Sequence, residues 1–225
     1  ITYFDTTAEE AKATHFTTLP GSVLGLTSAG QFLFAADPSG AWGSFYTFSS
    51  DGTLLSSDEW KNAESKEYIW SATTNRVYHY RDSTSPNDLE WTAIHPETGE
   101  LGDEGDSPYH GNTLSTRYPI LLHPEGNVIL NGAGQIVSDL TLEVINSLSN
   151  NILDATWIDG SLLTLTPHGF TLQIWSENYE LLGESKFSNI APFAIREIAD
   201  KLLIVGYQNG AVSFQHISLD NDSDE

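Results

Sequence analysis

The 225-residue sequence predicts an all-β protein built from one repeated element. Its apolar runs are short and rich in β-branched and aromatic residues, and turns containing Gly, Asn, Asp and Pro separate them. A strand–turn–strand pattern recurs five times along the chain. The best helical window, residues 6–16, is rich in Ala and Glu but has a narrow apolar face, so at most one short helix is expected there.

The five strand–turn–strand segments are spaced as repeats of a four-stranded element. They start at Gly30, Asn75, Gly126, Gly160 and Asp200. These starts lie roughly 34 to 51 residues apart, the length of a four-stranded repeat with variable loops. An apolar run precedes each segment and is predicted to form the innermost strand of its repeat, in residues 21–28, 66–73, 116–123, 151–158 and 190–198.

A twisted four-stranded sheet that is apolar on both faces needs cover on both. Radial packing around one axis supplies it, so the sequence predicts a β-propeller of five four-stranded blades in residues 1–219, followed by an acidic tail, residues 220–225. The last repeat lacks an outer strand, and residues 1–7 are predicted to close it and remove an exposed edge. Five tryptophans are predicted to fill the gaps between blades: Trp42, Trp70, Trp91, Trp157 and Trp175.

This organisation resembles β-propellers of the broad WD40, kelch and YVTN-like type over nearly the whole chain. The sequence has no Gly-His to Trp-Asp pairing, no double-Gly kelch pattern and no clear YVTN motif. The segments "TSPNDLEW" (84–91), "GDSPYHG" (105–111) and "HPEGNVILNGAGQIVSD" (123–139) are similar to blade repeats of uncharacterised secreted or surface proteins of bacteria. That resemblance implies a location and no particular activity.

The charge narrows the class of partner. Asp and Glu number 31 against 9 Lys and Arg, giving a formal net charge of −22. Such a field repels nucleic acid and anionic membranes and favours cationic partners, divalent ions or plain solubility. The chain has no Cys and no apolar run of about 18 residues, so neither disulfides nor membrane insertion are expected. Its composition and its start at Ile1 favour a processed or excised bacterial domain, secreted or on the cell surface.

The segment "GDSPYHG" contains the residue types of a hydrolase, in Asp106, Ser107 and His110. A nucleophilic Ser needs a positioned base and an oxyanion hole, usually at a strand-to-helix turn. No helix is predicted to follow, so we expect a polar turn and assign no catalytic residue. The histidines lack metal-binding spacing, and no cofactor is expected apart from a structural Ca²⁺ that acidic loops such as residues 36–44 could hold.

The few basic residues lie beside aromatic ones, a combination that binding surfaces favour. The candidate ligand-binding residues are Trp70, Tyr80, Arg81, Tyr109, His110 and Arg117. We therefore expect a monomeric, non-catalytic extracellular module that binds or displays a protein, peptide or glycan. Two alternatives stay open: a hydrolase or lyase acting on carbohydrate or lactone in a central channel, and a structural spacer in a larger surface protein. An enzyme should gather acidic or His side chains with perturbed pKa values, and a binder should present an aromatic rim.

Overall fold

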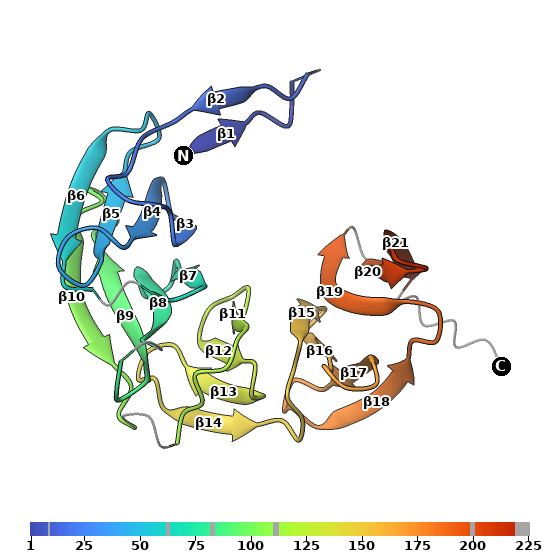
Figure 1. Ribbon diagram of the computed structural model, residues 1–225. Helices are drawn as coiled ribbons and strands as arrows, with labels where there is room; N and C mark the ends of the chain where they lie inside the picture. Colours follow the sequence, from blue (N-terminus) through green and yellow to red (C-terminus); the bar gives the residue numbers. More distant parts are fainter. Residues whose placement is uncertain (9, 62–63, 82–83, 110–112, 199–200, 219–225) are drawn as a thin grey trace. The chain divides into compact units, whose positions relative to one another are not determined.

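The computed structural model describes residues 1–8, 10–61, 64–81, 84–109, 113–198 and 201–218. Every regular element in these residues is a β-strand, which confirms the all-β class (Figure 1). The short helix expected in residues 6–16 is wrong: the described part of that segment forms turns and strand β2 (Ala13–His15). No helix long and apolar enough to span a membrane is present in the described part of the chain.

The strands form consecutive antiparallel sheets in which each strand pairs with its neighbours in sequence. The first sheet contains β3 (Gly25–Ala29), β4 (Phe32–Asp37), β5 (Ser44–Phe48) and β6 (Leu54–Glu59). The second contains β7 (Tyr68–Ser71), β8 (Arg76–Arg81), β9 (Asp88–Ile94) and β10 (Leu101–Asp106). The third contains β11 (Ile120–Leu122), β12 (Val128–Asn131), β13 (Gln135–Ser138) and β14 (Val144–Ser147). The fourth contains β15 (Asp154–Ile158), β16 (Ser161–Leu165), β17 (Thr171–Trp175) and β18 (Leu181–Lys186). The fifth has three described strands, β19 (Ala191–Ile198), β20 (Lys201–Gln208) and β21 (Ala211–Ser218).

The predicted repeat boundaries are confirmed. Each strand–turn–strand segment forms the second and third strands of one sheet, and each preceding apolar run contains the first strand, except that β3 extends one residue beyond its run, to Ala29. Four sheets have four strands and the last has three in the described residues, as the missing outer strand predicted. The structure does not confirm five complete blades. The acidic tail, residues 220–225, lies outside the described residues.

The N-terminal strand has a different partner from the one predicted. Strand β1 (Thr2–Phe4) pairs antiparallel with β2, with Tyr3 opposite Thr14. The ammonium group of Ile1 donates to the carbonyl of Thr17 at 2.8 Å, which holds the start of this hairpin. Among the described strands none pairs with the outer edge of β21, so the predicted closure of the last sheet by residues 1–7 is not observed.

The chain divides into two compact units. The first contains residues 1–116, 125–127 and 138–143, and the second contains residues 117–124, 128–137 and those from 144 on. In the first unit, aromatic and aliphatic side chains of the first two sheets form one core that includes Phe34, Phe45, Tyr68, Val77 and Ile94. The first strands approach closely, because a Cβ on Gly25 would lie 2.1 Å from the Tyr68 ring.

The second compact unit has two cores, one on each side of the fourth sheet. Trp157 and Trp175 pack between the third and fourth sheets, and the Trp175 indole donates to Thr164 Oγ1 at 2.9 Å. Leu165, Ile195 and other aliphatic side chains pack between the fourth and fifth sheets. The prediction that tryptophans fill gaps between sheets is therefore confirmed for Trp157 and Trp175.

For Trp42 that prediction is wrong. Its side chain is 62% exposed, because the turn between β4 and β5 places this residue at a positive φ of 66°, away from the sheet. Trp70 and Trp91, the remaining two, are partly buried in the first compact unit.

Candidate functional site

The first compact unit contains a pocket of about 330 Å³ between its two four-stranded sheets. We call it the charged pocket. Its lining comes from β5, from the two residues that follow β6, and from β8, β9 and β10. The residues used below are Trp60, Lys61, His79, Arg81, Glu90, Glu104 and Asp106.

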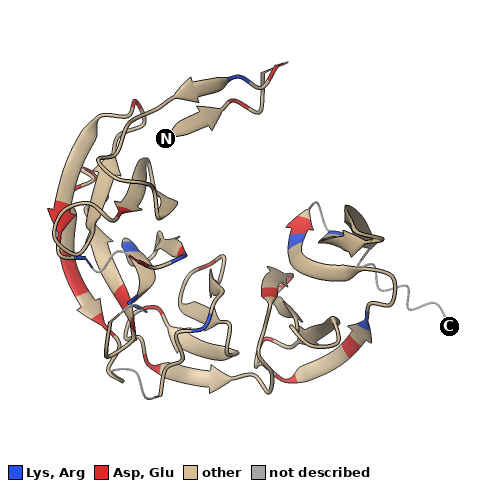
Figure 2. Ribbon diagram, in the orientation of Figure 1, with Lys and Arg blue, Asp and Glu red and all other residues tan. Residues whose placement is uncertain are grey.

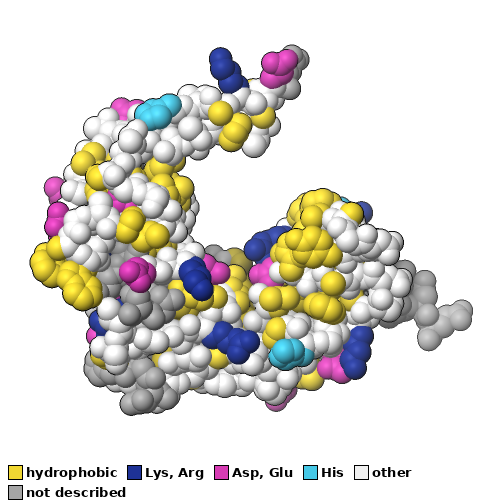
Figure 3. Space-filling model, in the orientation of Figure 1, with side chains coloured by type: hydrophobic (Ala, Val, Ile, Leu, Met, Phe, Trp, Pro, Cys, Tyr) yellow, Lys and Arg dark blue, Asp and Glu magenta, His cyan; other side chains and the backbone are white. Residues whose placement is uncertain are grey.

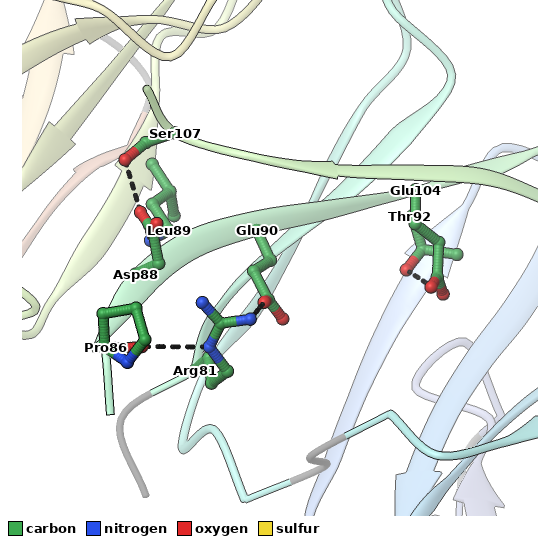
Figure 4. A network of polar contacts seen from close by, with 8 residues as sticks. All are labelled: Arg81, Pro86, Asp88, Leu89, Glu90, Thr92, Glu104 and Ser107. Carbon is green, nitrogen blue, oxygen red and sulfur yellow. Dashed lines mark hydrogen bonds and ion pairs between the residues drawn. The ribbon is translucent and has the colours of Figure 1, made fainter. Parts of the chain in front are cut away.

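Strand register places the charged lining on one face of the second sheet. His79 lies opposite Glu90, and Glu90 lies opposite Asp106. Residues directly opposite in a ladder project to the same side of the sheet. Arg81 forms an ion pair with Glu90, and its Nε donates to the carbonyl of Pro86 at 3.0 Å (Figure 4). The Arg81 guanidinium is therefore fixed beside the carboxylates.

Lys61 joins the ends of the two outer strands. Its ammonium group lies 2.6 Å from Asp58 and 2.5 Å from Glu104, and its side chain is only 8% exposed. Burial disfavours the charged ammonium, but the hydrogen bonds to Asp58 and Glu104 outweigh it, so the pKa of Lys61 is raised. Thr92 Oγ1 also donates to Glu104 at 3.3 Å (Figure 4). Figure 2 shows the acidic residues on the strands that Lys61 connects, β6 and β10.

Two titratable groups in the charged pocket are strongly perturbed. Burial raises the pKa of Glu90 to about 7, against the opposing effect of Arg81, and Asp106 is among the carboxylates that add to the rise. Burial lowers the pKa of His79 to about 3. Glu90 can therefore exchange a proton near neutral pH, whereas His79 is a neutral member of the aromatic core at physiological pH.

An exposed tryptophan stands at the rim of the pocket. Trp60 is 68% exposed and has a φ of 66°, a left-handed conformation that is unusual for a bulky residue. Its backbone N–H donates to the carbonyl of Ala41 at 2.8 Å, which holds it next to the turn that carries the exposed Trp42. Strained positions of this kind cluster at functional sites. The rim thus presents the Trp60 indole to solvent, and the exposed Trp42 lies in the adjacent turn.

The indole of Trp91 is fixed inside the second sheet. The Arg76 guanidinium lies 3.7 Å from the centre of its ring. On β10, a Cβ at Gly105 would lie 2.8 Å from the same ring, so Gly105 gives the indole its space. Its neighbours along β9, Glu90 and Thr92, line the charged pocket, so the Trp91 indole projects to the opposite face of the second sheet.

Of the six residues predicted to bind a ligand, Arg81 lines the charged pocket. Tyr80 is fully buried, and its hydroxyl donates to the carbonyl of Ser115 at 3.3 Å. Trp70 packs against the core of the first compact unit, and Tyr109 is half-buried. Arg117 belongs to the second compact unit, and His110 lies outside the described residues. The binding role of these residues stays a prediction.

Sequence reasoning did not single out Trp60, Lys61, Glu90 or Glu104. The available signal was "DEWK", residues 58–61, where a lone Trp follows a polar strand and has no apolar neighbours. An isolated indole in such a setting has little reason to be in a core.

Ser107, the candidate nucleophile of the "GDSPYHG" segment, has a structural role. It is fully buried, and its Oγ donates to Asp88 Oδ1 (Figure 4). Its backbone N–H donates to the carbonyl of Leu89 at 3.0 Å. The hydroxyl is therefore occupied and shielded from a substrate. The described residues also contain no group of three His, Asp or Glu side chains placed to hold a metal ion.

No protein-family model and no curated protein sequence matches the chain. Solved structures do match it in fold. A chain of the Mitotic Checkpoint Complex crystal structure aligns with a TM-score of 0.62 and 12% identity, over 97% of this chain and 71% of that one. The Dos1 propeller aligns with a TM-score of 0.59 and 9% identity, over 91% of this chain and 56% of that one. The WD40 β-propeller domain of Doa1 aligns with a TM-score of 0.50 and 14% identity, over 92% and 83%. The predicted resemblance to WD40-type propellers without a signature motif is confirmed at the level of fold.

Proposed function

We propose that this chain is a non-catalytic protein-interaction module that binds a basic segment of a partner protein at the charged pocket. The observation that carries the proposal is the pairing of an exposed, strained Trp60 with a wall of carboxylates that includes Glu104 and Asp106. An indole face and nearby carboxylates suit a Lys or Arg side chain, which gains both a cation–π contact and an ion pair.

The charge of the chain supports the same class of partner. With a net charge of −22, the protein attracts basic segments at long range, and this raises the association rate more than the affinity. The lining of the pocket favours a basic segment because its carboxylates, Glu90, Glu104 and Asp106, outnumber its cations. Arg81 pairs with Glu90, and Lys61 pairs with Asp58 and Glu104. The fold neighbours, which include a chain of a multiprotein complex, agree with an interaction role.

Fluorescence polarisation with a short labelled peptide of alternating Lys and Gly tests this proposal. We expect the protein to bind it, and Trp60→Ala and Asp106→Asn each to weaken binding about tenfold or more, the loss typical of a central interface residue. Glu97→Gln is the matched control: it removes the same charge as Asp106→Asn from an exposed position outside the charged pocket.

Equal weakening by Glu97→Gln and Asp106→Asn, with no effect of Trp60→Ala, would reduce the interaction to bulk electrostatics and overturn the site. A peptide of alternating Glu and Gly should not bind. Circular dichroism melting curves of each variant confirm that the fold is intact.

We also propose that the molecule closes as a five-bladed propeller in which the β1–β2 hairpin supplies the missing edge partner of β21. The open face of the fifth sheet supports this, since Tyr207, Val212 and Phe214 are each more than half exposed, and Figure 3 shows hydrophobic side chains over this sheet. Strand β1 has one edge paired with β2 and can offer the other.

The Cys-free chain allows a disulfide test of closure. Tyr3→Cys combined with Val212→Cys, Phe214→Cys or His216→Cys should form an intramolecular disulfide in one register. Tyr3→Cys with Thr14→Cys is the positive control, because these residues face each other across β1 and β2. A disulfide in the control and in none of the three test pairs would refute closure.

We also propose that the protein is secreted or lies on the cell surface, and that it is monomeric. The acidic, Cys-free composition supports the location. Fractionation of the native host cells and light scattering of the purified chain test them.

A further inference from the structure

The second compact unit contains a pocket of about 450 Å³ that has a different chemistry from the charged pocket. We call it the amide pocket. It lies between the segment that follows β14, residues 148–151, and the β16–β17 turn with strands β17 and β18. The side chains used here are Asn150, Thr166, His168, Gln173, Glu184 and Lys186.

The two pockets occupy equivalent positions in their sheets. Gln173 lies opposite Thr164 on one side and Glu184 on the other. In the second sheet, Glu90 has the same place, between His79 and Asp106. A carboxamide thus replaces a carboxylate of nearly the same shape at the centre of the third strand.

The segments that border the two pockets are also equivalent. Lys61 follows the outer strand β6, and its N–H donates to the carbonyl of Gly43 in the turn between the second and third strands of its sheet. Leu148 follows the outer strand β14, and its N–H donates to Gly134 in the corresponding turn, at 2.7 Å. The same gap between consecutive sheets is therefore built twice, once with charged side chains and once with amides and hydroxyls.

The amides of the second pocket retain hydrogen-bonding capacity. Gln173 is only 3% exposed, and its carboxamide makes two long contacts: Nε2 donates to Glu184 at 3.5 Å, and Oε1 accepts from Asn150 at 3.4 Å. A carboxamide carries two N–H donors and an oxygen with two acceptor sites, and contacts near 3.5 Å are at the outer limit of a hydrogen bond. A polar ligand that offers shorter contacts would bond to these groups.

We infer that the amide pocket binds a neutral, hydroxyl-rich ligand, a glycan. Each sugar hydroxyl both donates and accepts, as the carboxamides of Asn150 and Gln173 do. The charges of Glu184 and Lys186 cancel, so the lining selects no ion. The volume lies within the usual range for small-ligand sites of about 300–1,000 Å³. This inference does not depend on the proposed function, because the site, the compact unit and the ligand class all differ.

A glycan array of neutral oligosaccharides of glucose, galactose, mannose and N-acetylglucosamine tests the inference on the purified chain. The strongest binder is then titrated by calorimetry at low and high salt. We expect binding that salt does not weaken, because no net charge is involved. Asn150→Ala, at an exposed position, and Gln173→Glu, which installs the carboxylate found in the charged pocket, should each weaken it at least tenfold.

Trp60→Ala is the matched control, and it should leave glycan binding unchanged even if it abolishes binding of the basic peptide. An array without a neutral glycan above background would overturn the inference. So would affinity that survives in Asn150→Ala, or affinity that is lost in Trp60→Ala. If Gln173→Glu melts early, the Asn150→Ala result decides, because that side chain is at the surface.

Discussion

Replacing His79 with Phe is expected to remove an acid-induced loss of stability, so that mild acidification stabilises the variant. The imidazole is buried, and its ring lies 5.0 Å from that of Phe45 and 5.5 Å from that of Tyr68. Its Nδ1 has no hydrogen-bond partner among the described residues. Burial is the main cause that lowers the pKa of His79 to about 3, and the positive charges of Lys61 and Arg81 add to it.

The sign follows from the depressed pKa. In the unfolded chain the imidazole has a pKa of about 6.5 and takes up a proton as the pH falls, whereas the folded chain keeps it neutral. The stabilisation that the neutral, buried His79 contributes is therefore fully present above about pH 6.5 and is lost as the pH falls toward about 3. Between about pH 7.5 and about pH 5.5 the loss integrates to about 1.4 kcal/mol in the free energy of unfolding. Both conditions lie above the sequence pI of 4.3.

Glu90 acts in the opposite direction. Its pKa is raised to about 7 from 4.5, so its contribution is fully present below pH 4.5 and is lost as the pH rises through about 7. Over the same interval, acidification would raise the free energy of unfolding by up to about 2 kcal/mol if Glu90 were dry. Because the side chain is partly hydrated, the expected rise is about 1 kcal/mol. The wild-type free energy of unfolding should therefore be nearly flat between the two conditions.

Urea unfolding, followed by tryptophan fluorescence at both pH values, measures the two effects. On acidification, the free energy of unfolding of His79→Phe should rise by about 1 kcal/mol from its value at the higher pH. That of Glu90→Gln should fall by about 1.4 kcal/mol. His15→Gln, at an exposed position on β2, should follow the wild type. If His79→Phe and wild type show the same dependence on pH, His79 is protonated normally in the folded protein and the reasoning is refuted.

Three further predictions concern packing and ions. Gly105→Ala should lower the free energy of unfolding by about 1–3 kcal/mol, because its Cβ would lie 2.8 Å from the Trp91 ring. Gly183→Ala is the control and should leave the melting temperature unchanged, because the space around its Cβ is open. In urea unfolding, Trp175→Ala should lower the free energy of unfolding by about 3–5 kcal/mol, because the side chain is buried. Trp42→Ala, at an exposed position, should lower it by about 0.5 kcal/mol or less. Equal losses in the two variants would contradict the assignment of Trp175 to the core. Millimolar Ca²⁺ should raise the melting temperature if the acidic loops hold an ion, and an unchanged temperature would remove that prediction.

The repeat architecture was accessible from sequence because it depends on local patterns. Short apolar runs between turn residues located the first three strands of every sheet. The hairpin of β1 and β2 was missed, since residues 13–15 carry no apolar alternation and their pairing is set by backbone contacts. The exposure of Trp42 was missed because its positive φ, in a turn, reverses the direction that strand alternation suggests.

The candidate site was less accessible because it depends on register. Tyr80 and Arg81 are adjacent on β8, and successive residues of a strand project to opposite faces, so only one of them can reach a given pocket. Glu90 and Asp106 become neighbours through a pairing between β9 and β10 that includes an irregularity after Leu101. Composition cannot locate such a shift, so Arg81 was found and Glu90 was not.

The most direct test of the central claim follows the indole N–H signals of the six tryptophans by NMR while the Lys–Gly peptide is added. Binding at the charged pocket predicts that the Trp60 signal moves and saturates, and that the buried Trp157 and Trp175 signals stay in place. A Trp60 signal that does not move while the peptide binds would contradict the account.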